Sequence, residues 1–192
     1  DAIIQVVGGK TADQGSTRAS ASDGETSFEL RRAGNDSAVV TASWSLTADT
    51  RYTAIAYGAE GALKMAMLEE DEDQPDAGKA RLRLYNTSAD SGSLDLYLTA
   101  SDTALEDAAI TATVAASGAS SFVTLAPGSY RLRLTASGDT ADLRLDLPAV
   151  TVNDRGVVTL VLTAGTGGVL VHAATLEQDG GLLAFKNPAA RV

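Results

Sequence analysis

The sequence predicts an all-β protein of the sandwich or barrel class, because short segments of alternating apolar and polar residues are separated by turn-forming residues. The alternation is clearest at residues 142–147 (DLRLDL), where three leucines share one face. A shift of one residue there would bury three charges, so the register of this strand is firmly specified. The same pattern occurs in residues 80–86, 93–98 and 130–134. The predicted turns are residues 86–92, 126–128, 136–139 and 152–156.

Three further segments are harder to interpret. Residues 60–69 favour a strand, because Leu63, Met65 and Met67 alternate with other residues, whereas the Ala-rich residues 103–109 remain a helix candidate. Residues 156–176 carry no full charge and are long enough to span a membrane, but glycines and threonines interrupt them. We interpret them as two strands joined by a Gly-rich turn and expect no membrane insertion.

Composition excludes several function classes. The 192 residues include no Cys and one His, which removes disulfides, thiol nucleophiles and metal centres that need several imidazoles. The net charge of −10 argues against nucleic acid, because phosphate binding needs a basic face. No export signal is visible at the start of the sequence, so any signal is absent or already removed.

The sequence repeats itself. Residues 27–38 match 129–141, residues 47–51 match 151–155, and residues 68–71 match 176–179, with small insertions between them. These matches predict an N-terminal domain at residues 1–73, a charged linker at 74–79, a C-terminal domain at 80–179, and an extra strand or tail at 180–192.

The two repeats differ at their beginnings. The second repeat has room for about eight short strands, whereas residues 2–7 align best with residues 109–114, the third strand of that repeat. The first domain is therefore expected to lack two opening strands. Residues 182–190 resemble residues 81–89, at an offset of 101, and so look like a spare first strand.

Several motifs resemble the DUF4397 domain, an Ig-like β-sandwich of exported proteins. They are residues 83–90 (RLYNTSAD), 94–98 (LDLYL), 125–130 (LAPGSY) and the closing hairpin 157–176. The resemblance covers residues 79–180 and, as a partial copy, residues 27–73. It implies two tandem Ig-like antiparallel β-sandwich domains, the first without its opening strands, together with export and a cell-surface or matrix role. The family brings no catalytic residues to this sequence.

Candidate sites of chemistry are few, and we expect no enzyme and no cofactor. His172 lacks a second His or Cys to share a metal and is interpreted as a packed or surface residue. The acidic residues 69–76 could offer oxygen ligands to calcium, but a solvated linker is the simpler interpretation. The Gly-rich residues 8–11 and 165–168 are interpreted as turns rather than phosphate loops. Asn35 and Asn86 begin formal glycosylation sequons.

Two function classes remain. The first is an extracellular structural subunit whose C-terminal strand completes the next copy and so builds a head-to-tail homopolymer, a filament or a matrix. The expected donor residues are Leu182, Leu183, Ala184 and Phe185, and Ile3, Ile4 and Val6 are expected near the acceptor groove. Alternatively, the tail folds back onto the first domain of its own chain, or the first domain is a smaller variant. The second class is a monomeric surface module for adhesion, in which loops recognise a glycan or another cell-surface protein.

Overall fold

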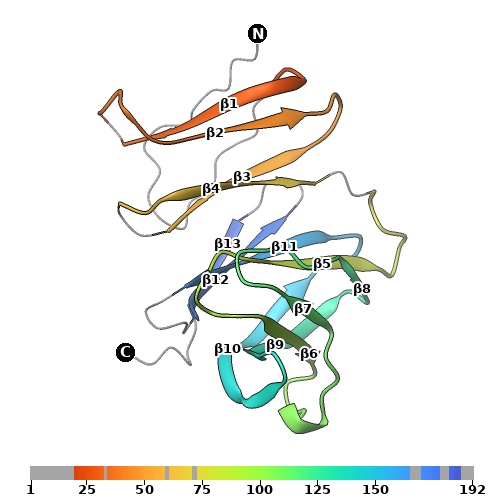
Figure 1. Ribbon diagram of the computed structural model, residues 1–192. Helices are drawn as coiled ribbons and strands as arrows, with labels where there is room; N and C mark the ends of the chain where they lie inside the picture. The colour runs from red at the N-terminus through yellow and green to blue at the C-terminus, as the bar shows by residue number, and fades with distance from the viewer. Residues whose placement is uncertain are drawn as a thin grey trace. The chain divides into compact units, whose positions relative to one another are not determined.

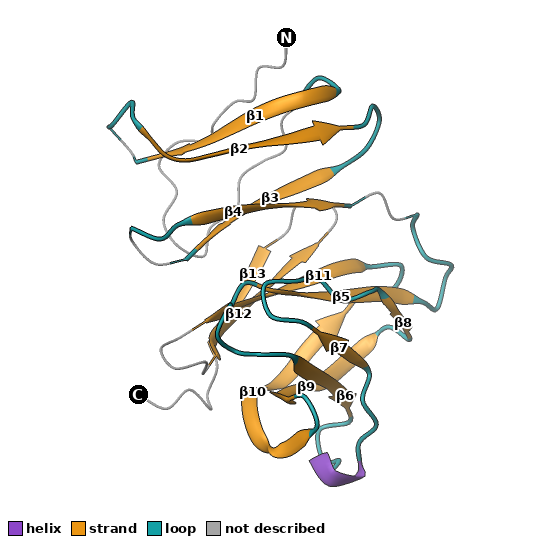
Figure 2. Ribbon diagram, in the orientation of Figure 1, coloured by secondary structure: helices purple, strands orange, loops and turns teal. Residues whose placement is uncertain are grey.

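The computed structural model describes residues 20–32, 34–58, 61–70, 73–164, 170–177 and 182–186. The chain divides into two compact units, Asp1–Asp73 and Gln74–Val192. In the described residues, strands dominate and a single 3-10 turn, η1 (Leu105–Asp107), is the helical element. Figures 1 and 2 show these elements along the chain. The all-β class predicted from the sequence is confirmed.

The described residues of the first unit form two antiparallel ribbons. β1 (Gly24–Arg31) pairs with β2 (Ala38–Leu46), and β3 (Tyr52–Tyr57) pairs with β4 (Lys64–Glu69). β4 is the strand that the alternation of residues 60–69 predicts. Each ribbon appears in Figure 1 as a separate pair of arrows.

In the second unit, the described strands form two sheets. One has the order β10-β9-β6-β7, and the other has the order β13-β12-β11-β5-β8. All pairs are antiparallel except β5 and β11, which run parallel. The strands are β5 (Ala80–Asn86), β6 (Leu94–Thr99), β7 (Ala112–Val114), β8 (Val123–Leu125), β9 (Gly128–Ala136), β10 (Asp139–Val152), β11 (Val157–Ala164), β12 (Leu170–Glu177) and β13 (Leu182–Lys186).

The two sheets of the second unit share one apolar core, which makes this unit sandwich-like. Alternation puts one face of each strand inward, and leucines of β5, β6, β9, β10 and β11 fill the space. The largest fully buried side chains are Leu82, Leu84, Leu94, Leu96, Leu132, Leu134, Leu145, Leu147, Leu160, Leu162 and Val114. Burial of this many leucines supplies the main favourable free energy of folding.

Two ambiguous segments are resolved in the structure. Of the helix candidate 103–109, the residues Leu105–Asp107 form one 3-10 turn. The uncharged segment 156–176 contains strands β11 and β12, and its Gly-rich turn lies outside the described residues. The described part of the chain contains no helix that is long and apolar enough to cross a membrane.

Candidate assembly site

The strands of the first unit correspond to the last four strands before β13 in the second unit. The repeat aligns β1 and β2 with β9 and β10, and β3 and β4 with β11 and β12. In the second unit, β9 has a further neighbour in β6 and β11 has one in β5. Within residues 20–73, as far as they are described, β1 pairs with β2 and β3 pairs with β4, and each ribbon is a two-stranded sheet. The sheet positions equivalent to β5 and β6 are therefore not filled by a described strand of this unit.

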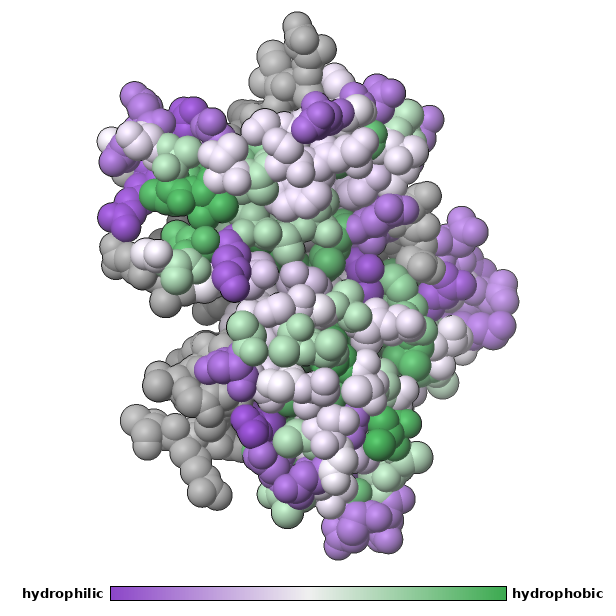
Figure 3. Space-filling view, viewed as in Figure 1, coloured by the Kyte–Doolittle hydropathy of each residue, from purple (hydrophilic) through white to green (hydrophobic). Residues whose placement is uncertain are grey.

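The ribbons of the first unit bury much less apolar surface than their counterparts. Among the described hydrophobic residues of this unit, Leu46 and Leu68 are buried, and Val39 is 41% exposed. Apart from the buried Thr26 and Leu46, the inward positions of β1 and β2 are half-buried, including Phe28 and Trp44, whose rings pack edge to face with centroids 5.4 Å apart. Figure 3 shows apolar surface on this unit next to hydrophilic side chains. Strands whose apolar face and edge are only partly covered can pair with a further strand.

The predicted donor residues Leu182, Leu183, Ala184 and Phe185 lie in β13, an outer strand of the five-stranded sheet. β13 pairs antiparallel with β12 of its own chain, with Ala184 opposite Ala174. The extra strand that the sequence predicts is therefore present as β13, and in the single chain it pairs with β12 of the second unit. The predicted acceptor residues Ile3, Ile4 and Val6 lie outside the described residues.

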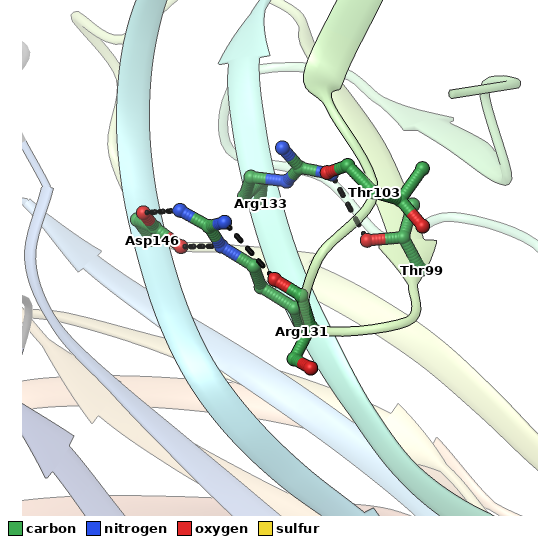
Figure 4. A network of polar contacts seen from close by, with 6 residues as sticks. Thr99, Thr103, Arg131, Arg133 and Asp146 are labelled. Atoms are coloured by element: carbon green, nitrogen blue, oxygen red, sulfur yellow. Dashed lines mark hydrogen bonds and ion pairs between the residues drawn. The ribbon is translucent and has the colours of Figure 1, made fainter. Parts of the chain in front are cut away.

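A polar network holds residues 99–103 onto the outer face of β9 (Figure 4). The Arg131 guanidinium donates to both carboxylate oxygens of Asp146, at 2.9 and 2.7 Å, and to the Ser101 carbonyl oxygen at 3.3 Å. Arg133 donates through Nη2 to the Thr99 hydroxyl at 2.9 Å and to the Thr103 carbonyl oxygen at 3.0 Å. The hydrogen bonds to Asp146 raise the pKa of Arg131, whereas burial, followed by the charge of Arg131, lowers the pKa of Arg133. These arginines fasten a loop to the sheet.

Asp95 of β6 is a second buried polar centre, with 2% of its surface exposed. Its carboxylate accepts hydrogen bonds from the Thr113 hydroxyl at 2.6 Å, the Ser137 hydroxyl at 3.0 Å and the Gly138 N–H at 2.8 Å. Burial on its own raises the pKa of Asp95, but the three hydrogen bonds together leave that pKa below its ordinary value. The carboxylate therefore ties β6 to β7 and to the β9–β10 turn. The alternating LDLYL segment predicted the strand but gave no sign that its aspartate is buried.

The first sequence motif of the DUF4397 resemblance is a structural turn. The buried Asn86 accepts at Oδ1 from the Ser88 N–H at 3.0 Å and donates through Nδ2 to the Ser91 hydroxyl at 2.9 Å. Thr87 donates through its hydroxyl to the Leu162 carbonyl oxygen at 2.7 Å. The Asn86 sequon is thus engaged in folding, whereas Asn35, the other sequon, lies at an exposed turn.

The remaining candidates, as far as the structure describes them, do not come together in a reaction centre. Among the described residues, no group of three or more His, Cys, Asp or Glu side chains could hold a metal ion. His172 lies in β12, opposite Thr163 and Lys186 in the strand register. In the acidic segment, Asp76 forms an exposed ion pair with Lys79 at 3.0 Å, and the hydrogen bond from Lys79 lowers the pKa of Asp76. Residues 71 and 72 of that segment, and both Gly-rich loops, lie outside the described residues.

The fold defines an all-β protein with mostly antiparallel strand pairs whose second unit is sandwich-like. Residues 5–97 match the family model described as DUF4397, a domain of unknown function, and this match supports the resemblance predicted from the sequence. The matched range covers most of the first unit, the linker, β5 and most of β6, whereas the motifs placed the stronger resemblance at residues 79–180. No curated protein matches the chain.

Proposed function

We propose that the protein is a non-catalytic, extracellular structural subunit that assembles into a filament or matrix by β-strand donation between copies. Both units are Ig-like sandwiches in this proposal, and the first is completed by a strand from another copy. The observation that carries the proposal is the difference between the units: β9 and β11 have neighbours in β6 and β5, whereas the described residues of the first unit give β1 and β3 no such neighbours.

The range of the family match supports an arrangement in which each unit is completed by strands that follow the preceding unit in the sequence. It runs without interruption from the first unit through β5 and into β6, and these two strands take part in the sheets of the second unit. In this proposal, strands that follow one unit in the sequence complete the next unit. Residues 182–190 follow the second unit in the same way and resemble residues 81–89, the β5 segment and its turn.

The proposed donor residues are Leu182, Leu183, Ala184 and Phe185, with Ile3, Ile4 and Val6 near the acceptor groove. Strand addition satisfies backbone N–H and C=O groups along an open edge and covers apolar side chains beneath it. Donation from one end of a copy to the other end of the next is a heterologous contact, which builds a ring or an open filament. The partners are therefore copies of the same chain.

Negative-stain microscopy and light scattering test the proposal on the full chain and on a version that ends at Asp179. We expect filaments or large oligomers for the full chain and their loss in the shortened version. Because β13 is an outer strand of its sheet, the shortened chain is expected to stay folded, and circular dichroism checks that it does. A monodisperse monomer in both cases would overturn the proposal and direct the search to glycan and protein binding by a surface adhesion module.

A further inference from the structure

The second unit shows how a further strand pairs with the edge that no described strand occupies in the first unit. β5 runs parallel to β11, with Leu82 opposite Val158 and Leu84 opposite Leu160. All four side chains belong to the core and are at most 3% exposed. An equivalent strand beside β3 would therefore also run parallel to its neighbour.

The hairpin registers align β3 with β11 residue by residue. Both hairpins end in a Leu-Glu pair, at residues 68–69 and 176–177, which the internal repeat matches. The glutamate of this pair lies opposite Tyr52 in the first unit and opposite Val158 in the second. Tyr52 therefore takes the place of Val158, and two residues further on Ala54 takes the place of Leu160.

The tail aligns with β5 in the same way. Residues 182–187 (LLAFKN) match residues 81–86 (RLRLYN) at an offset of 101. Leu183 thus corresponds to Leu82, and Phe185 corresponds to Leu84.

From these alignments we infer that the donated strand of a second copy runs parallel to β3, with Leu183 opposite Tyr52 and Phe185 opposite Ala54. This inference rests on the proposed function. Where the second unit packs two leucines side by side, the first would pack a phenylalanine against an alanine, and this exchange of large for small approximately conserves volume. Ala54 and Ala56 are exposed in the single chain, which leaves room over β3 for a large side chain.

β13 is paired with β12 by one of its edges through residues 182–186 in the single chain. No described strand pairs with its other edge. The inferred pairing with β3 of another copy therefore either adds to this second edge or replaces the pairing with β12. The within-chain pairing competes with polymerisation only in the second case.

Paired cysteines can distinguish these arrangements, because the sequence contains no Cys of its own. Thr53 and Ala184 are opposite each other in the inferred register, and neighbouring strands lie about 4.8 Å apart, within the range that a disulfide spans. A Thr53→Cys/Ala184→Cys variant should form a ladder of disulfide-linked multimers on oxidation. A Ser27→Cys/Ala184→Cys variant, which probes the edge of β1 that no described strand occupies, and the corresponding single-cysteine variants should not form this ladder.

An Ala174→Cys/Ala184→Cys variant locks the within-chain pair seen in the structure. If β13 leaves β12 on assembly, the oxidised variant should be a cross-linked monomer that forms filaments only when a reductant is added, whereas filaments of the oxidised variant would show that β3 adds to the second edge of β13. The Ala54→Phe substitution, at an exposed position, should also block filaments without unfolding the chain, whereas Ser45→Phe, exposed on β2, should leave them intact.

The outcomes separate the inference from the proposed function. If filaments vanish in the version ending at Asp179 but the multimers form through position 27 instead of 53, strand donation stands and the inferred edge is wrong. If oxidation of the Thr53→Cys/Ala184→Cys variant gives a monomer with an internal disulfide, the tail fills the first unit of its own chain, and the inference is overturned. If the full chain forms no assemblies at all, the proposed function itself fails.

Discussion

The β1–β2 ribbon and the β9–β10 ribbon have related sequences but different surroundings. Leu132 and Leu134 of β9 are completely buried, because a second sheet covers them, whereas Leu30, the counterpart of Leu132 in β1, is half-buried. Alternation of apolar and polar residues thus defines which face of a strand turns inward. It does not determine how completely that face is covered, since coverage depends on strands from elsewhere.

The largest expected effect comes from truncating matched leucines in the two ribbons. Leu132→Ala should lower the free energy of unfolding of the second unit by about 3 kcal/mol, because it leaves a cavity in a closed core. Leu30→Ala should cost about 1 kcal/mol in the isolated chain, because its side chain already meets solvent. Urea unfolding measures both, with the single Trp of the sequence, Trp44, reporting on the first unit. Equal losses would contradict the difference in coverage.

A smaller effect is expected at Asp95, which has no counterpart in the described first unit. Asp95→Asn replaces a charged acceptor of three hydrogen bonds and should cost about 2 kcal/mol at neutral pH. Because the folded pKa lies below the ordinary value of 3.8, this stabilisation is present above that value and is lost as the pH falls through the lowered pKa. Urea unfolding between pH 2 and 7 should show a weaker acid dependence in the variant, and Asp139→Asn, at an exposed position, serves as the control. An unchanged pH profile would assign the acid dependence to other carboxylates.

The smallest effect concerns the turn between β3 and β4, which positions the inferred acceptor edge. Gly58 has a φ of +105°, and a Cβ there would come within 2.6 Å of the Ala62 carbonyl oxygen. Gly61, with a φ of +83°, has open space around it. Both substitutions strain the backbone, because both glycines have a positive φ, but only Gly58→Ala also brings a Cβ against the Ala62 carbonyl oxygen. Gly58→Ala should therefore lower the free energy of unfolding of the first unit by about 1 kcal/mol more than Gly61→Ala. Thermal unfolding followed by Trp44 fluorescence measures the difference, and equal melting temperatures would refute it.

Much of the fold could be predicted from the sequence, because long alternating strands carry a strong local signal. Residues 80–86 and the strand at residues 64–69 are examples. β7 and β8, with three residues each, are too short for alternation to be visible. The parallel pairing of β5 with β11 joins segments 76 residues apart in register, and no local pattern encodes such a pairing.

The candidate site was less predictable than the fold. The sequence indicated a spare strand at residues 182–186, and the structure contains that strand. Its pairing with β12 could not be predicted, because it depends on which strand edges of the folded protein can accept a further strand. The burial of Arg133 was also invisible in the sequence, because it depends on residues 99–103 folding over an outward face. Periodicity assigns a side chain to a face and says nothing about what later covers that face.

The parallel alignment of β5 with β11 has a mechanical consequence. β11 is antiparallel to β12 and β12 is antiparallel to β13, so β5, β11 and β13 all run in one direction. A pull between the linker before β5 and the end of β13 would act at opposite ends of this sheet and load its hydrogen bonds in shear. Bonds loaded in shear share the force and must break together, whereas bonds that are unzipped break one at a time. The five-stranded sheet is thus arranged to resist tension along the chain.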